Sequence, residues 1–241
     1  MIKTILIFSF VILCVVFLFP FAVISTILYF LGLRKAMTMA VYRLAQLWAR
    51  ITILFAEVTV TVTGRENIPK KGGVCFVSNH CGFFDIVLLI AYCGRPFGFV
   101  AKKELAWLPL FGAWIYMLGG LFIDRKSVKK AIKTINKGVK RIKKGGGMLI
   151  FPEGTRSKGR GLLPFHAGSL KLATQSDSII VPVAIEGSYE VFEKTRRVSK
   201  CVASISFCPT IDTKTLTPDE KKQALSDRIY NVINEQLAKN A

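Results

Sequence analysis

Two residues suited to act as a general base and its orienting partner stand five positions apart in the sequence. His80, one of only two histidines, follows an apolar stretch typical of a buried strand, and Asp85 lies near the start of the next helical segment. Open α/β sheets bind their ligands at strand ends of this kind. A turn at Gly82 would bring the Asp85 carboxylate against the imidazole. A hydrogen bond to Nδ1–H would then fix the tautomer and leave Nε2 free to accept a proton.

This pair supplies two of the three groups of a Ser-His-Asp triad, and the sequence contains no G-x-S-x-G motif to supply the third. The missing hydroxyl could therefore belong to the substrate. Cys81 is adjacent to His80, but adjacent side chains usually point apart, which disfavours a thiol nucleophile. Taken alone, the pair is also compatible with a purely structural hydrogen bond at a helix start.

Two further segments, 119–125 and 151–157, each place an arginine just after a short apolar strand. These arginines, Arg125 and Arg156, are suited to bidentate phosphate binding. Gly154 permits a tight turn that leaves backbone N–H groups free for an anion. Each arginine taken singly is typical of a solvated surface, but three basic strand ends near one histidine favour a shared anion site. The third strand end contributes Lys102 and Lys103.

The segments that must position these residues alternate between strands and helices. Residues 58–63 read V-T-V-T-V-T, which is the strict alternation of a half-buried strand. Further strands are predicted at 73–77, 97–101, 121–123, 148–151, 179–185 and 202–207, and helices at 84–92, 127–144, 167–175 and after a capping box at 217–220. This order predicts an α/β domain with a mixed sheet flanked by helices.

The N-terminal segment has the composition of a membrane-anchoring helix. No charge occurs from residue 4 to residue 33. A straight helix of that length would be ~45 Å long, against a hydrocarbon core of ~30 Å. Pro20 should kink or break it, so a tilted span and a helix within one leaflet both remain open. A signal peptide is the competing interpretation, but the run is too long and lacks a clear A-x-A cleavage site.

A second N-terminal helix is predicted at about 35–55. Its apolar stripe consists of Met37, Val41, Leu44, Trp48 and Ile51. Such a helix could lie on a membrane interface, pack on the first helix or belong to the core of the domain. We therefore predict residues 1–56 as N-terminal membrane-associated helices and residues 57–241 as the α/β domain. The strongly basic remainder places that domain on the cytoplasmic face of the membrane.

The net charge points to an anionic partner. The 34 Lys and Arg residues exceed the 15 Asp and Glu residues, which gives +19, while 51% of the chain is hydrophobic. Charge and apolar content together favour anionic lipid over nucleic acid, for which exposed aromatics among basic residues would be expected. The basic face of the helix at 127–144 could attract lipid headgroups or an acidic carrier protein, or could simply be solvated. The six cysteines lack metal-site spacing, so we expect reduced, mostly buried thiols.

Four blocks of the chain resemble, in order, the motifs of glycerolipid acyltransferases, in particular the 1-acyl-sn-glycerol-3-phosphate (lysophosphatidate) acyltransferases. The blocks are His80-x-x-x-x-Asp85, residues 119–125, residues 151–157 and residues 180–184. A lone His-x-x-x-x-Asp is a weak signal, but together with F-P-E-G-T-R-S at this distance it is specific. The resemblance covers the region from about residue 77 to about residue 187.

This resemblance implies transfer of a fatty acyl group from acyl-CoA or acyl-carrier protein to the sn-2 hydroxyl of lysophosphatidate, in phospholipid biosynthesis, with no metal or other cofactor. His80 would be the general base and Asp85 its orienting partner. The implied glycerol phosphate site consists of Arg125, Glu153, Gly154, Thr155 and Arg156. Two alternatives stay open: an acyltransferase for another acceptor, such as glycerol-3-phosphate or another lysolipid, and a non-enzymatic membrane lipid-binding protein.

Overall fold

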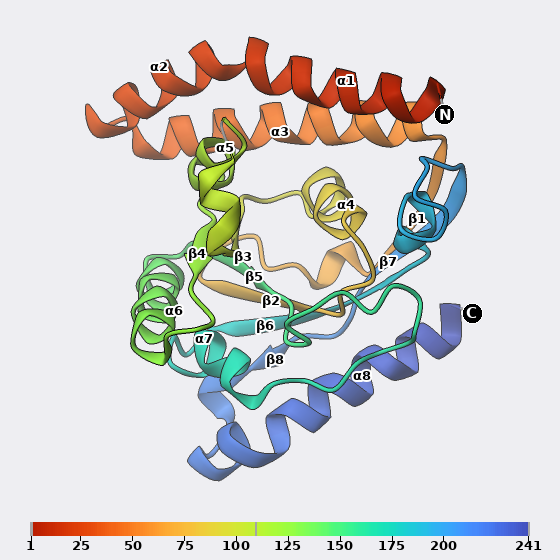
Figure 1. The fold of residues 1–241 in the computed structure, drawn as a ribbon. Coiled ribbons are helices and arrows are strands. Elements are labelled where there is room, and N and C mark those ends of the chain that lie inside the picture. Colours follow the sequence, from red (N-terminus) through yellow and green to blue (C-terminus); the bar gives the residue numbers. More distant parts are fainter. Residues whose placement is uncertain (1, 109, 241) are drawn as a thin grey trace.

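The strands form a mixed sheet with helices on both faces, as the sequence predicts (Figure 1). The computed structural model describes residues 2–108 and 110–240. Within the sheet, strands follow the order β1-β7-β6-β2-β5-β3-β4, and β8 pairs with β6. The run from β6 to β4 is parallel, whereas β7 and β8 are antiparallel to β6. The strands are β1 Val58–Thr63, β2 Val74–Ser78, β3 Phe97–Lys102, β4 Leu121–Ile123, β5 Gly147–Ile150, β6 Ile179–Glu186, β7 Cys201–Phe207 and β8 Ile211–Asp212.

The central strand β2 divides two hydrophobic cores. Val74 and Phe76 pack into the core that includes α3 and α4, whereas Cys75 and Val77 pack into the core that includes α6, α7 and α8. All of β2 is buried because parallel strands of this kind are covered by helices on both faces. The helices are α1 Ile2–Phe17, α2 Phe19–Phe30, α3 Arg34–Ala56, α4 Phe84–Tyr92, α5 Phe111–Met117, α6 Val128–Lys143, α7 Lys171–Thr174 and α8 Leu225–Asn240.

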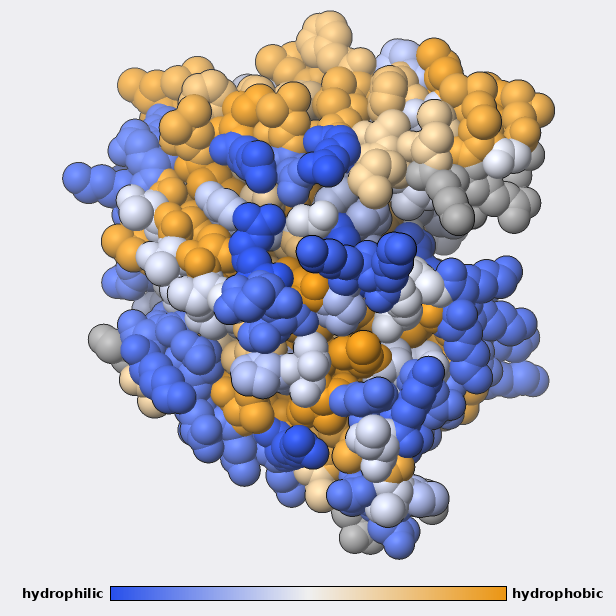
Figure 2. Space-filling view, turned by 180° about the vertical axis from the view of Figure 1, so that it is seen from behind, coloured by the Kyte–Doolittle hydropathy of each residue, from blue (hydrophilic) through white to orange (hydrophobic). Residues whose placement is uncertain are grey.

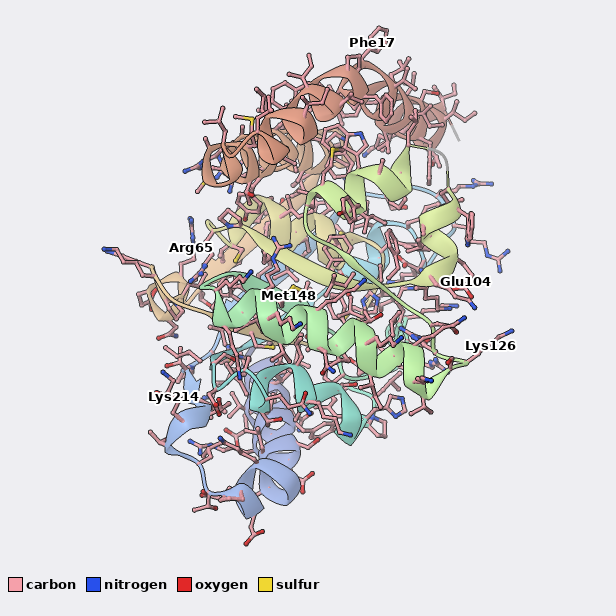
Figure 3. The ribbon with its side chains drawn as sticks, turned by 90° about the vertical axis from the view of Figure 1, so that its left-hand side faces the viewer. Phe17, Arg65, Glu104, Lys126, Met148 and Lys214 are labelled. Atoms are coloured by element: carbon pink, nitrogen blue, oxygen red, sulfur yellow. The ribbon has the colours of Figure 1, made fainter. Side chains whose placement is uncertain are left out.

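The apolar N-terminal run forms two consecutive helices, α1 and α2, and the break at Leu18 comes just before Pro20. The break agrees with the expected effect of Pro20, because proline has no N–H to donate to the carbonyl of Val16. One helical stretch in the described chain, Ile2–Ser25, is long and apolar enough to cross a membrane. Figure 2 shows hydrophobic residues gathered over this layer, and Figure 3 shows Phe17 pointing away from the rest of the protein.

Helix α3 lies between this apolar layer and α4, and it shares the first hydrophobic core. Val41 of the predicted stripe is deeply buried, but the other stripe residues are only partly buried, and the most buried positions also include Ala45 and Ala49. The Tyr42 hydroxyl and the Gln46 amide donate to backbone carbonyls at the end of α4, at 3.3 and 3.1 Å. Small and polar residues make this contact, so hydrophobic periodicity alone did not find it. The change in composition near residue 56 is therefore not a boundary of the core.

Two helix ends behave as their sequences indicate. The Ser127 hydroxyl accepts from Lys130 N–H at 3.4 Å and caps α6. Thr217 and Glu220 form the reciprocal bonds of a capping box, at 3.3 and 2.7 Å, ahead of the π-helical turn Glu220–Ala224 that leads into α8. The apolar residues of α6 divide between core and surface: Val139 and Ile142 are buried, whereas Val128 and Ile132 are exposed.

Candidate active site

His80 and Asp85 form a hydrogen-bonded pair at the carboxyl end of β2. His80 Nδ1 lies 2.7 Å from Asp85 Oδ2, and the same oxygen accepts the Gly82 N–H at 3.0 Å. The other oxygen, Oδ1, accepts a short hydrogen bond from the Ser188 hydroxyl. The Asp85 side chain is fully buried, whereas 19% of the His80 side chain is exposed. The expected turn at Gly82 is thus present, and the carboxylate holds the imidazole through Nδ1 while the ring remains accessible.

The surroundings of His80 restrict the imidazole further. Its ring stacks on Phe151 with a centroid separation of 4.0 Å and an interplanar angle of 14°. The preceding residue, Asn79, accepts from Ile185 N–H and donates to Ile185 O, each at 2.8 Å, and so joins the ends of β2 and β6. Ser157 N–H donates to the His80 carbonyl at 2.7 Å. Ring and backbone are therefore both fixed, as a positioned general base requires.

Glu153 is buried and binds the backbone of His80. Glu153 is only 2% exposed. Its carboxylate oxygens accept hydrogen bonds from two backbone N–H groups, that of His80 at 2.7 Å and that of Leu163 at 3.3 Å. Burial raises the pKa of Glu153 to about 7, and the nearby Asp85 charge adds to this, while the two N–H donors oppose it. The sequence grouped Glu153 with the phosphate contacts, but the structure places it where it can position His80.

The predicted phosphate contacts meet at the same edge of the sheet. Arg125 follows β4 and donates a short hydrogen bond to the Gly154 carbonyl in the loop after β5. Thr155 is exposed in that loop. Lys103 binds Asp124 at 2.9 Å, and the pKa of the Asp124 carboxyl is lowered mainly by this hydrogen bond. Lys102, at the end of β3, is exposed.

Arg156 is held on two sides. Its Cζ lies 3.5 Å from the centroid of the Phe83 ring, and its Nη1 donates to Glu193 Oε1 at 2.9 Å. Phe83 belongs to the turn between His80 and Asp85, so Arg156 lies against that turn. Glu193 and Ser188 are the two site residues that the sequence did not reveal. Both follow β6, beyond the fourth motif, and no spacing pattern marks them.

These contacts connect the first three motifs, whereas Lys102 faces solvent. Glu153 contacts the backbone of His80, Arg125 contacts Gly154, and Arg156 contacts Phe83. Within the described residues, no group of three or more His, Cys, Asp or Glu side chains is arranged to hold a metal ion. The expectation of a reaction without metal stays a prediction.

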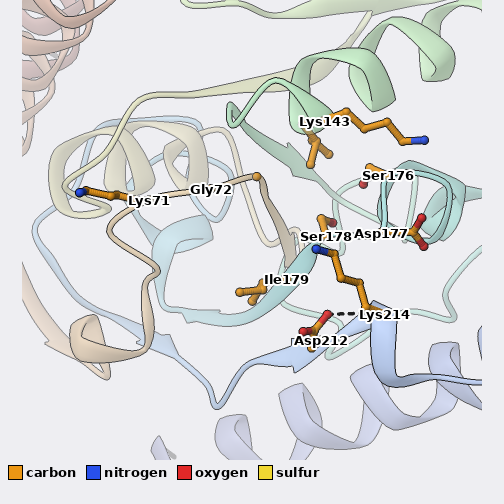
Figure 4. A pocket seen from close by; sticks show the side chains of 11 residues that line it. Lys71, Gly72, Lys143, Ser176, Asp177, Ser178, Ile179, Asp212 and Lys214 are labelled. Atoms are coloured by element: carbon orange, nitrogen blue, oxygen red, sulfur yellow. Dashed lines mark hydrogen bonds between the residues drawn. The ribbon is translucent and has the colours of Figure 1, made fainter.

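A separate hollow of about 370 Å³ lies at the opposite edge of the sheet, beside the amino ends of β2 and β6 (Figure 4). Lys71, Lys143 and Lys214 line it together with Asp177 and Asp212. The carboxylates are already engaged by the chain, at 3.0 Å from Lys221 Nζ and 2.9 Å from Lys214 N–H. This hollow is therefore distinct from the His80 site, which lies at the carboxyl ends of the strands.

Comparison with known proteins identifies a family and several named relatives. The family model described as Acyltransferase matches residues 59–186, which include all four motifs. The 1-acyl-sn-glycerol-3-phosphate acyltransferase of Borreliella burgdorferi is 30% identical over 79% of this chain and 74% of its own length. The enzyme of that name from Escherichia coli is 31% identical over 69% of this chain and 68% of its own.

A solved structure confirms the fold. The crystal structure of the 1-acyl-sn-glycerophosphate (LPA) acyltransferase PlsC from Thermotoga maritima superposes with a TM-score of 0.85. The match covers 99% of this chain and 94% of that one at 23% sequence identity. The similarity extends over the N-terminal helices as well as the sheet.

Proposed function

The chain belongs to the acyltransferase family, and from that premise we propose that it transfers a fatty acyl group from a thioester to the sn-2 hydroxyl of lysophosphatidate, giving phosphatidate. One observation carries the proposal: the buried Asp85 carboxylate holds Nδ1 of a partly exposed imidazole at 2.7 Å. The relatives named for this activity support the choice of acceptor.

The reaction then uses His80 Nε2 as the base. Nε2 takes the proton of the substrate hydroxyl as its oxygen attacks the thioester carbonyl carbon. Asp85 stabilises the imidazolium that forms, since its carboxylate already bonds Nδ1. The tetrahedral intermediate collapses with cleavage of the C–S bond, and the imidazolium returns the proton to the departing thiolate. No covalent intermediate on the protein is required, because the acceptor itself supplies the nucleophile.

The acceptor phosphate is assigned to the guanidinium groups of Arg125 and Arg156. Arg125 bonds the loop that carries Gly154, and Arg156 lies on Phe83 beside the catalytic turn. Two planar, permanently charged groups at one edge suit a phosphate monoester. In this assignment Glu153 positions His80 and does not contact phosphate.

The lipid nature of the acceptor agrees with the apolar helices. Stretch Ile2–Ser25 is a candidate membrane anchor, and Phe8 of α1 contacts Phe192 in the segment that follows β6, with ring centroids 5.5 Å apart. The segment after β6, which borders the proposed acceptor site, therefore packs directly against the apolar helix α1. We assign the protein to the cytoplasmic membrane with its domain on the cytoplasmic face, and acyl-CoA or acyl-carrier protein as donor.

The test is an assay of the purified protein in detergent. Lysophosphatidate, glycerol-3-phosphate and a lysolipid without a phosphate monoester are each offered with acyl-CoA and with acyl-carrier protein, and the acylated product is measured. Phosphatidate should form fastest, and His80→Ala should lower kcat by ~10²–10⁴, the usual contribution of a general base. A folded His80→Ala protein that turns over near the wild-type rate would exclude this mechanism. Preference for another acceptor would exclude the proposed substrate.

A further inference from the structure

Glu193 is a buried carboxylate at the active-site edge that neither the motifs nor the general-base mechanism accounts for. Only 6% of its side chain is exposed. Its Oε1 accepts two hydrogen bonds, from Arg156 Nη1 at 2.9 Å and from the Phe83 backbone N–H at 2.6 Å. Its Oε2 is buried and has no hydrogen-bond partner within the described chain. A buried oxygen without a partner is costly, so retaining a carboxylate here calls for a specific role.

The first contact fixes the orientation of Arg156. The guanidinium lies with its face on the Phe83 ring, 3.5 Å from the ring centroid, and with one N–H edge on Glu193. A guanidinium has five N–H donors, and Glu193 engages only one of its nitrogens. The partly exposed Arg156 can thus present its remaining N–H donors to a phosphate in an orientation that is already fixed before binding.

The second contact reaches the turn that holds the base. Phe83 N–H lies between the two members of the pair, three and two residues from His80 and Asp85. The backbone of this turn is packed closely on the carboxylate, because a Cβ added at Gly82 would lie 2.8 Å from Glu193 Oε2. Glu193 Oε1 therefore connects Arg156, a predicted phosphate-binding residue, with the turn that carries His80 and Asp85.

The segment around Glu193 is itself anchored on both sides. Ser188 bonds Asp85, and Val198 N–H donates to Thr4 Oγ1 of α1 at 2.9 Å. The carboxylate consequently has a fixed position relative to both the imidazole and the apolar layer. A mobile surface acid could not set the distance between two binding groups in this way.

We infer that Glu193 is the positioning residue that fixes Arg156 relative to the His80–Asp85 turn, so that a bound phosphate places the acceptor hydroxyl at His80 Nε2. This inference rests on the proposed function and adds a residue from outside the four motifs. Glu193 acts through Arg156 and the turn and does not itself contact the phosphate, which its charge would repel.

The test is Glu193→Gln, which keeps the size and one acceptor oxygen but removes the charge. Loss of one charge-assisted contact should raise KM for lysophosphatidate about tenfold or more, with a smaller fall in kcat. Glu190→Gln is the matched control, since Glu190 lies three residues earlier and its carboxylate bonds the exposed Lys194 and the neighbouring Tyr189 hydroxyl. It should leave both constants unchanged. Thermal unfolding shows whether each variant is folded.

Two further variants keep the inference testable if Glu193→Gln does not fold. Phe83→Ala removes the ring under Arg156 but keeps the backbone N–H, and Phe83 is 58% exposed, so the protein should fold. It should also raise KM for lysophosphatidate more than it lowers kcat. Arg156→Lys combined with Glu193→Gln should cost less than the sum of the two single changes, because both weaken the same contact between residues 156 and 193.

Unchanged KM in Glu193→Gln or in Phe83→Ala would overturn the inference, as would strictly additive effects in the double variant. Failure of the proposed function looks different. The wild-type protein would then fail to acylate lysophosphatidate at all, whereas the inference concerns only the ratio of variant to wild type on the acceptor that is used.

Discussion

The buried carboxyl of Glu153 should make the stability of the protein depend on pH. Its pKa is about 7 in the folded protein, against an ordinary value of 4.5. Because the folded pKa is raised, the stability that this group contributes is complete below about pH 4.5 and is lost as pH rises through about 7. The difference between the two pKa values corresponds to about 3 kcal/mol, of which about 2 kcal/mol falls between about pH 5 and about pH 7.

Glu153→Gln removes this titration. The amide oxygen can accept only one of the two backbone N–H groups, so the variant should lose about 1 kcal/mol of hydrogen bonding at every pH. Near pH 5 the two proteins should be about equally stable, and near pH 8 the variant should be more stable by about 2 kcal/mol. For a chain of this size that difference is a Tm shift of about 4–8 °C.

Thermal unfolding in detergent across this pH range measures the effect, with Glu190→Gln as a control at a partly exposed carboxylate that should follow the wild-type curve. Parallel curves for wild type and Glu153→Gln would refute the reasoning, because they would mean that Glu153 ionises alike in the folded and unfolded chain.

Three more changes test other contacts. Gly82→Ala should destabilise the protein by about 1–3 kcal/mol, because the new methyl group would meet Glu193 and the backbone. Gly168→Ala is the control, since a methyl group there meets nothing within 4 Å. Thermal unfolding of both variants measures the difference, and equal Tm values would contradict it. Ser188→Ala leaves Asp85 Oδ1 without its hydroxyl donor, so the variant should lose about 1–3 kcal/mol of folding stability and have a lower kcat. A variant with wild-type stability and rate would show that this hydrogen bond is dispensable. Charge reversal on α6 should leave binding to anionic vesicles unchanged, because the sheet separates α6 from the apolar helices; a salt-dependent loss of binding in vesicle sedimentation would show that α6 reaches the headgroups. The α6 residues changed to Glu are Lys133, Lys137 and Lys140.

The sequence predicted most elements of the fold because their signals are local. The V-T-V-T-V-T strand, the Ser127 cap and the Thr217–Glu220 box each depend on residues a few positions apart, and each is present. Short elements such as α5 and β8 were not predicted, since they contain too few residues to show a period. The strand order was not predicted either, because pairing is decided by contacts distant in the sequence.

The site follows the same division. His80 and Asp85 are five residues apart, so their geometry could be predicted from one turn. Ser188 and Glu193 lie more than 100 residues away from the groups that they bind, and isolated Ser and Glu residues carry no pattern. The burial of Glu153 could not be predicted for a related reason. Its position in the third motif is visible in the sequence, but its burial beneath His80 depends on the packing of the loop after β5.

The arrangement of layers bears on how a lipid could reach the base. A lysolipid must present its hydroxyl to His80 while its acyl chain remains in apolar surroundings. In this fold the segment after β6 contacts Asp85 through Ser188 and contacts α1 through Phe192 and Val198. The same short segment thus sets the position of the base relative to the helices with the apolar surface. The basic helix α6 lies beyond α3, α4 and the sheet, at about 10 Å per layer and so several Debye lengths away. Under the proposed function, apolar contact through α1 and α2 together with the arginines at the sheet edge would therefore suffice to recognise a lipid phosphate without a contribution from α6.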